Sequence, residues 1–197
     1  MDVSEAASWF ATVPLDGWDG SQWVSNVAYG DFHAYDRFIT ERTFGAKKRI
    51  FLQPDDKRLD VAAYPVVRTP DGKQYIVLSD NADIEGVSRY QSTLLMVEAG
   101  YSADVVEFQT TTLASGQQSS PTPVTLSTSV CDLERFSVDK SDEFSTVVYG
   151  MFKIVLPASI TVDTDHELLI DGAYYEVQDV SPELLAQAIR ALKRTAA

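Results

Sequence analysis

The sequence predicts a mostly β protein, a small β-barrel or sandwich with a C-terminal helix and an extended aromatic N-terminal arm. Short runs rich in β-branched and aromatic residues recur beyond residue 47, separated by polar or glycine-containing stretches. Pro-Asp-Gly and Asp-Gly stand between two pairs of these runs, where tight hairpins need such residues. The 197 residues, 45% of them hydrophobic, are enough for one good core or two small ones.

Residues 1–46 are predicted to form the N-terminal arm. Large aromatic side chains lie in its first half among turn-forming Asp-Gly pairs: Trp9, Phe10, Trp18 and Trp23. Tryptophan is a common interface anchor, so these four residues are candidate interface residues, and packing onto the protein's own β-core is the equally open alternative. Apolar residues spaced three and four apart over residues 31–42 allow a short helix, although the same residues also suit a strand.

Residues 47–197 are predicted to form the β domain. Its clearest local feature is a hairpin that joins residues 64–68 to residues 74–78 through Thr69-Pro70-Asp71-Gly72, because proline presets φ and glycine accepts the turn conformation. A short strand at 49–52 precedes this hairpin and is ended by Pro54. The further predicted strands are residues 92–98, 104–112, 124–129, 134–138 and 144–156.

Residues 114–123 lack apolar periodicity and are predicted to be a flexible loop. Long irregular segments in compact domains are often functional, so Gly116, Gln117 and Gln118 are candidate interface residues that order against a partner. The alternative is an ordinary mobile surface loop.

The C-terminal part predicts a hairpin followed by a helix. An apolar run at 168–170 leads through Asp171-Gly172 into residues 174–177, the pattern of a tight β-turn between two strands. The helix is predicted over residues 181–194, with Ser181 as its N-cap and Pro182 at its first position. Basic residues in its last turn complement the helix dipole.

The composition excludes several kinds of chemistry. The balance of 16 basic against 29 acidic residues gives a net charge of -13, which repels nucleic acid and anionic lipid. No run of about 18 apolar residues occurs, and the first residues lack a signal-peptide pattern, so we expect a soluble chain made in the cytoplasm without a membrane partner. The single cysteine, Cys131, excludes an internal disulfide.

No catalytic motif accompanies the two histidines, His33 and His166, and phosphate-binding glycine loops are absent from the sequence. The acidic run at 163–167 has carboxylates of the kind that bind calcium, but it lacks the turn glycine of an EF-hand and is interpreted as a solvated turn. We therefore expect no catalytic residue, no metal site and no cofactor.

The segment 162–180 resembles the closing hairpin of bacteriophage head closure proteins, also called stoppers or head-tail adaptors. Those proteins often end with Asp-Gly-x-x-Tyr-x-Val-x-x-Val, and the matching residues here are Asp171, Gly172, Tyr175, Val177 and Val180. The resemblance implies a small β-barrel that forms a ring beneath the portal and joins it to the tail, with no catalytic residues.

This resemblance implies several partners. The chain would associate with copies of itself in a ring, contact a portal or adaptor protein and tail proteins, and let DNA pass without specific binding. It would be made in the host cytoplasm and reside in the virion. A tail terminator or tail-tube component is the nearest alternative. A β-sandwich module that binds carbohydrate or peptide in an aromatic groove is an alternative of another class.

Overall fold

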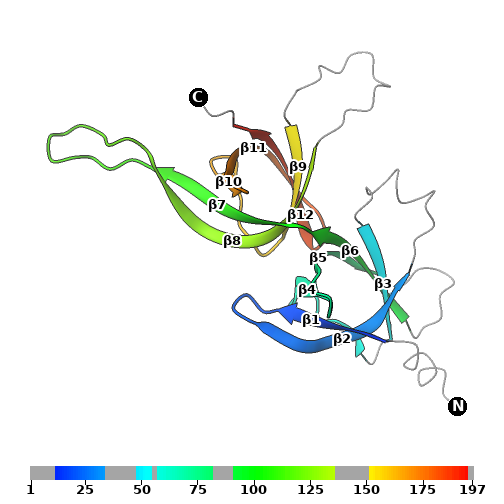
Figure 1. Cartoon of the computed structure of the whole chain (residues 1–197). Helices are drawn as coiled ribbons and strands as arrows, with labels where there is room; N and C mark the ends of the chain where they lie inside the picture. Colours follow the sequence, from blue (N-terminus) through cyan, green and yellow to red (C-terminus); the bar gives the residue numbers. More distant parts are fainter. Residues whose placement is uncertain (1–11, 34–47, 55–56, 82–90, 136–150, 195–197) are drawn as a thin grey trace, which may run out of the picture. The chain divides into compact units, whose positions relative to one another are not determined.

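The computed structural model describes residues 12–33, 48–54, 57–81, 91–135 and 151–194 (Figure 1). Within these ranges the secondary structure is almost entirely β-strand, with no α-helix. The predicted mostly β fold with a barrel is therefore confirmed. No helix in these ranges is long and apolar enough to cross a membrane.

The chain divides into two compact units, and each contains a six-stranded closed barrel. The first unit comprises residues 1–100, 157–159 and 183–186, and the second comprises residues 101–156, 160–182 and 187–197. This division differs from the predicted boundary at residue 46, because the strands on both sides of that residue belong to the same barrel.

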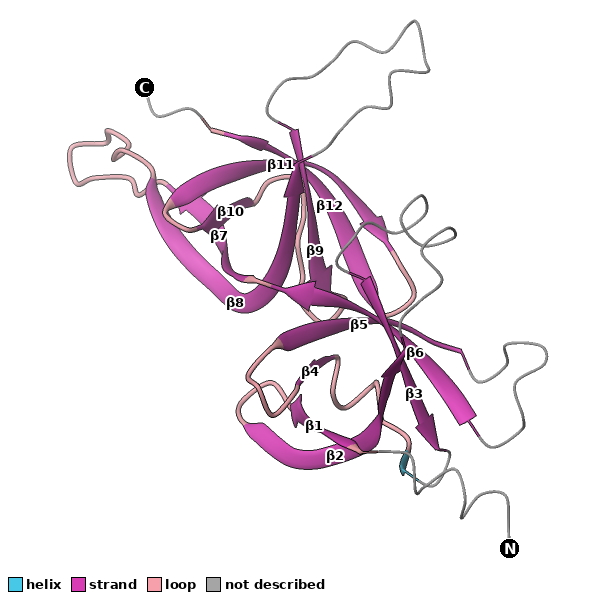
Figure 2. Ribbon diagram, turned by 45° about the vertical axis from the view of Figure 1, so that its right-hand side comes forward, coloured by secondary structure: helices cyan, strands magenta, loops and turns pink. Residues whose placement is uncertain are grey.

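The first barrel has the strand order β1-β2-β3-β6-β5-β4, and β4 pairs back onto β1 (Figure 2). Its strands are β1 (Val13–Trp18), β2 (Trp23–His33), β3 (Lys48–Pro54), β4 (Val66–Arg68), β5 (Gln74–Asn81) and β6 (Gln91–Ala99). All of its strand pairs are antiparallel. The core contains Leu15, Phe51, Val67, Leu94 and Met96, all fully buried.

The second barrel has the order β10-β11-β12-β9-β8-β7, and β7 pairs back onto β10. Its strands are β7 (Tyr101–Gln109), β8 (Thr122–Arg135), β9 (Met151–Pro157), β10 (Glu167–Ile170), β11 (Ala173–Pro182) and β12 (Ala186–Lys193). Its separate core includes Val105, Ile154, Leu156, Leu168 and Ile189. The hydrophobic content of the chain thus supports two small cores.

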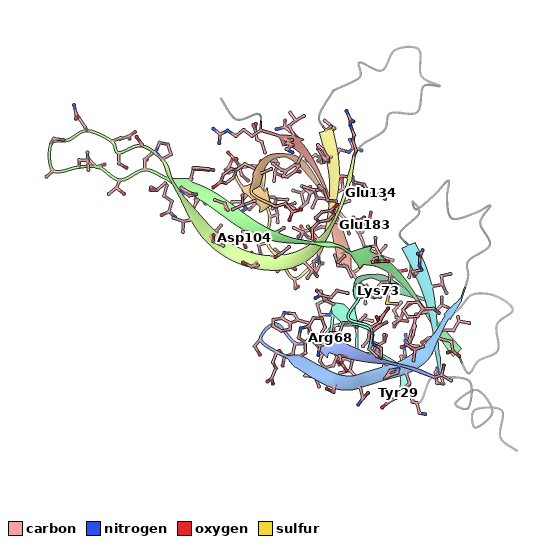
Figure 3. The ribbon with its side chains drawn as sticks, in the orientation of Figure 1. Tyr29, Arg68, Lys73, Asp104, Glu134 and Glu183 are labelled. Carbon is pink, nitrogen blue, oxygen red and sulfur yellow. The ribbon has the colours of Figure 1, made fainter. Side chains whose placement is uncertain are left out.

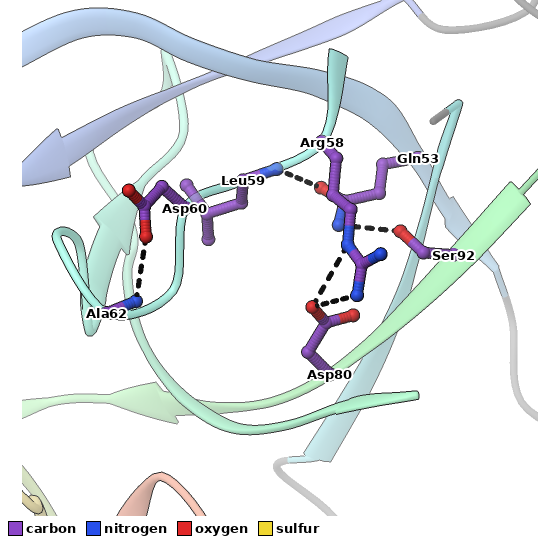
Figure 4. Close-up of polar contacts among 7 residues, drawn as sticks. All are labelled: Gln53, Arg58, Leu59, Asp60, Ala62, Asp80 and Ser92. Carbon is purple, nitrogen blue, oxygen red and sulfur yellow. Dashed lines mark hydrogen bonds and ion pairs between the residues drawn. The ribbon is translucent and has the colours of Figure 1, made fainter. Parts of the chain in front are cut away.

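A polar network holds the segment between β3 and β4 against the first barrel (Figure 4). The side-chain amide of the fully buried Gln53 donates from Nε2 to Ser92 Oγ at 2.8 Å and accepts from the backbone N–H of Leu59 at 2.9 Å. Arg58 donates to Asp80 Oδ2 from Nη2 at 2.6 Å. Both polar atoms of the buried Gln53 amide therefore have a hydrogen-bond partner. Because one of these partners is the backbone N–H of Leu59, the Leu59 backbone is held beside the core, and its side chain packs there.

Both predicted hairpins are present. The turn between β4 and β5 has Gly72 at φ +85°, with Val67 paired to Tyr75. The turn between β10 and β11 has Asp171 at φ +48° and Gly172 at φ +75°, as a two-residue type I′ hairpin requires.

The predicted C-terminal helix is wrong. Residues 181 and 182 end β11, residues 183–185 form the connection, and Ala186–Lys193 is the strand β12. Pro182 pairs with Gln187 in the β11–β12 ladder instead of starting a helix. Ile189 and Ala191 are buried at alternate positions, because β12 completes the barrel between β11 and β9. Closure of the barrel therefore overrides the local helix-capping pattern.

The predicted N-terminal arm is wrong for residues 13–33, which form β1 and β2 of the first barrel. Trp9 and Phe10 lie outside the described residues, as does most of the short helix predicted for 31–42. The part of that segment that is described, residues 31–33, belongs to β2.

Candidate assembly surface

Strands β7 and β8 extend past the second barrel as a hairpin (Figures 1 and 2). Strand β10 pairs with β7 only over residues 103–106, and β9 pairs with β8 only over residues 132–135. From residue 107 of β7 to residue 131 of β8, the two strands pair only with each other among the described strands. We call residues 108–130 of this hairpin the arm. Residues 108–124 lie beyond the pairing of β7 with β10, and residues 125–130 of β8 lie beside the barrel part of β7, where β9 does not cover them.

The tip of the arm is an ordered turn. The backbone N–H of Gly116 donates to Leu113 O at 2.8 Å, and the N–H of Leu113 donates to Gln117 O at 2.7 Å. Thr112 and Gln118 form an antiparallel bridge just below the turn. The predicted loop 114–123 is therefore shorter than expected, because residues 122 and 123 already belong to β8. Gly116, Gln117 and Gln118 are all exposed at the tip.

The arm differs chemically from the rest of the chain. No Asp, Glu, Lys or Arg occurs from residue 108 to residue 131, although 23% of the chain is charged. Leu113, Val124 and Leu126 are 49%, 39% and 49% exposed, and of the large hydrophobic side chains in the described residues only Leu184 is similarly exposed. Exposed apolar side chains on a projecting, uncharged element are typical of a protein interface.

The base of the arm is held by a cluster on the second barrel. The ring of Phe108 lies 5.6 Å from that of Tyr174, and the guanidinium of Arg194 lies 5.7 Å from the Phe108 ring. Arg194 also donates from Nη1 to Glu167 Oε1 at 2.9 Å, and its backbone N–H donates to Tyr174 O at 2.8 Å. These contacts restrain the direction in which the hairpin leaves the barrel.

A second contact ties β8 of the arm to the part of β7 that pairs with β10. Thr128 on β8 donates from its hydroxyl at 2.6 Å to Oδ1 of Asp104 on β7, and Asp104 is labelled in Figure 3. Between Val105 and Val106 the register of the two strands shifts, so that β8 carries a bulge at Leu126. A bulge increases the local twist, which turns the outer half of the arm relative to the barrel wall.

The two described tryptophans of the predicted interface, Trp18 and Trp23, pair with each other at the β1–β2 end of the first barrel. Their ring centroids are 5.4 Å apart, and the guanidinium of Arg68 lies 4.5 Å from the Trp23 ring. Arg68 in turn donates from Nε to Asp16 Oδ2 at 3.1 Å. Trp18 and Trp23 thus contact each other and a side chain of their own barrel, and the interface assignment of the four aromatics stays a prediction.

The turn that joins β1 to β2 is organised by Asp19. Its Oδ1 accepts hydrogen bonds from the backbone N–H groups of Gln22 and Ser21 and from the Ser21 hydroxyl, each at 2.8 Å. The bond from the Gln22 N–H, followed by those from Ser21, lowers the pKa of Asp19 below its ordinary value of 3.8. The fully exposed carboxylate thus has a structural function in the turn.

The acidic run at 163–167 also forms a structural turn. Nδ1 of His166 accepts the backbone N–H of Asp163 at 3.0 Å, and Glu167 pairs with Arg194 at the base of the arm. Over the described ranges no group of three or more metal-ligating side chains comes together. Cys131 is buried in the core of the second barrel.

The structure brings the hairpin residues of the resemblance together. Asp171 and Gly172 form the turn, while Tyr175 and Val177 point into the second core and are 4% and 2% exposed. Leu113, Val124 and Leu126 were not among the candidate residues predicted from the sequence; the signal that could have indicated them is the long uncharged run in a strongly acidic chain.

Comparison with known proteins adds no relative: no protein-family model matches the sequence, and neither the curated proteins nor the solved structures contain a significant match.

Proposed function

We propose that this chain is a structural protein of a tailed bacteriophage that forms a ring in the head-to-tail neck, joins the portal to the tail and lets DNA pass. In this proposal the chain has no catalytic function and binds no cofactor. The sequence pattern of the β10–β11 hairpin supports the proposal, as does the small closed barrel to which this hairpin belongs.

The single observation that carries the proposal is the arm. It projects from a rigid barrel, its direction is restrained by Phe108 and Arg194, and its apolar side chains are exposed without a partner in the described residues. An element of this kind is costly for an isolated protein, because exposed apolar groups and open strand edges promote association. Assembly with other subunits would cover these apolar groups and strand edges.

The charge of the chain supports the passage of DNA. A net charge of -13 disfavours the release of counterions that drives binding to phosphate backbones, so a ring lined by this protein would let DNA slide. The uncharged arm allows subunits of the same charge to meet without strong repulsion.

A tail terminator or tail-tube component would use the same kind of ring, and it remains the nearest alternative proposal. The carbohydrate- or peptide-binding module is less well supported. Such a module needs free aromatic faces, whereas the Trp23 ring is covered by Arg68 and lies beside Trp18.

The proposal is tested in phage particles that carry this chain. In one variant, residues 110–121 are replaced by Asn-Gly, because the paired positions of Gln109 and Thr122 suit a two-residue turn and Thr122 has the backbone N–H that closes it. We expect electron microscopy to show filled heads that lack tails, or empty heads that have lost their DNA. Leu184→Ser, which removes an exposed leucine outside the arm, is the control and should leave the particles complete.

Two results would contradict the proposal. One is complete, infectious particles with the shortened arm, provided that circular dichroism shows intact barrels. The other is absence of the chain from purified particles by mass spectrometry. Localisation of the chain by cryo-electron microscopy distinguishes a neck ring from a tail terminator or tail-tube ring.

A further inference from the structure

Within the described residues, no strand pairs with the outer edge of β8 from Val124 to Val130. Strand β9 covers β8 only from Asp132 onward, and no other described strand pairs with the outer side of the preceding residues. Pro123 limits the edge at its first end, because proline has no N–H to donate. The open edge therefore offers alternating backbone N–H and C=O groups over seven residues.

Open strand edges are normally protected by charged side chains, above all lysine. The edge of β8 has none, since its residues are Val-Thr-Leu-Ser-Thr-Ser-Val. Five of the seven are β-branched or leucine, residue types that pair well across strands. The bulge at Leu126 twists this edge but leaves it uncovered.

We propose that in the free protein this edge is covered by the same edge of a second copy, paired antiparallel about a two-fold axis. The dimer would protect the arm until assembly separates the two copies. The role of the dimer before assembly rests on the proposed neck function, whereas the pairing of two copies does not depend on it.

Charge allows a second copy to come close at this edge. Two copies with a charge of -13 each repel one another where acidic surfaces meet, but along the arm no charged residue faces another in any pairing register. Like charges directly opposite each other destabilise a strand pair, and the arm avoids this cost completely.

Shape also favours an identical partner. A strand that pairs with this edge must share its twist and accommodate the irregularity at Leu126. A second copy of β8 has the same twist, and a two-fold axis near Leu126 sets the two bulges opposite each other. This arrangement also places the Leu126 side chains of the two copies near each other, so that each covers part of the other's exposed surface.

The test is sedimentation equilibrium of the full chain over a range of concentrations. We expect the wild-type chain to be a dimer, and Leu126→Lys to weaken dimerisation by about tenfold or more, because lysine on an open edge blocks strand pairing. Ser115→Lys is the matched control: it adds the same charge to the arm, but at the tip and away from the edge, and should leave the dimer intact.

Spin labels at an introduced cysteine, Thr125→Cys, give an independent measurement. We expect the labels of two copies to lie within about 20 Å of each other, as adjacent antiparallel strands require. A wild-type chain that stays monomeric would overturn the proposal. So would a dimer that Leu126→Lys leaves unchanged, or labels that are far apart. Each of these results leaves the particle experiment on the neck function unaffected.

Discussion

The turn at Gly172 allows a clean test of how backbone conformation stabilises the second barrel. Gly172 has a φ of +75°, and a Cβ atom added there would meet no heavy atom within 4 Å. The cost of a side chain is therefore only the strain of an L-residue in the left-handed region, about 1–2 kcal/mol. We expect Gly172→Ala to lower the free energy of unfolding by about 1 kcal/mol, and Gly172→Val by about 2 kcal/mol because valine is β-branched.

Gly100 is the matched control, because a Cβ atom there also meets nothing within 4 Å, while its φ is not positive. Gly100→Ala should change stability by less than about 0.5 kcal/mol, or raise it slightly by restricting the unfolded chain. Urea unfolding followed by circular dichroism measures all three variants. Equal unfolding midpoints for Gly172→Ala and the wild type, or an equal loss in Gly100→Ala, would refute the reasoning.

Four further predictions concern other parts of the chain. Gly30→Ala should cost about 1–3 kcal/mol in urea unfolding, because its Cβ atom would lie 2.2 Å from the backbone oxygen of Leu52. Arg194→Ala should speed amide hydrogen exchange in the arm relative to the wild type, whereas a variant far from the arm should not. Equal exchange rates in Arg194→Ala and the wild type would show that the contacts of Arg194 and Phe108 do not restrain the arm. The lowered pKa of Asp19 predicts that its turn is fully stabilised above pH 3.8 and loses its hydrogen bonds as the pH falls through the lowered pKa, which amide chemical shifts would follow. Burial, followed by the charge of a nearby carboxylate, raises the pKa of Tyr175 above 10, so its contribution to stability is complete below pH 10 and is lost at higher pH; an absorbance titration in which all tyrosines ionise together near pH 10 would contradict this.

Local turn chemistry explains which elements were predicted well. The Asp171-Gly172 and Pro70-Asp71-Gly72 turns depend on the φ values of two or three neighbouring residues, so their sequences were sufficient to locate both hairpins. The same kind of local argument failed at Ser181-Pro182. The capping pattern there is real, but the hydrogen bonds and burial available to β12 in a closed barrel outweigh it.

The candidate site was predicted only in part. Gly116, Gln117 and Gln118 do lie at an exposed tip, but the length of the arm could not be read from the sequence. That length depends on where β9 and β10 stop pairing with the hairpin, and these strands are distant in sequence. The pairing of Trp23 with Arg68 likewise joins residues from two strands that become neighbours only when the barrel closes.

The sequence by itself determined the β class, the positions of the tight turns and the uncharged character of residues 108–131. These properties follow from residue type and from dihedral angles, which act over a few neighbouring residues. Only the tertiary structure decided that two barrels form instead of one, that the last segment is a strand, and that part of one hairpin extends beyond its barrel. Strand pairing is the reason, because each strand's register and partner depend on hydrogen bonds and burial supplied by segments far away in the chain.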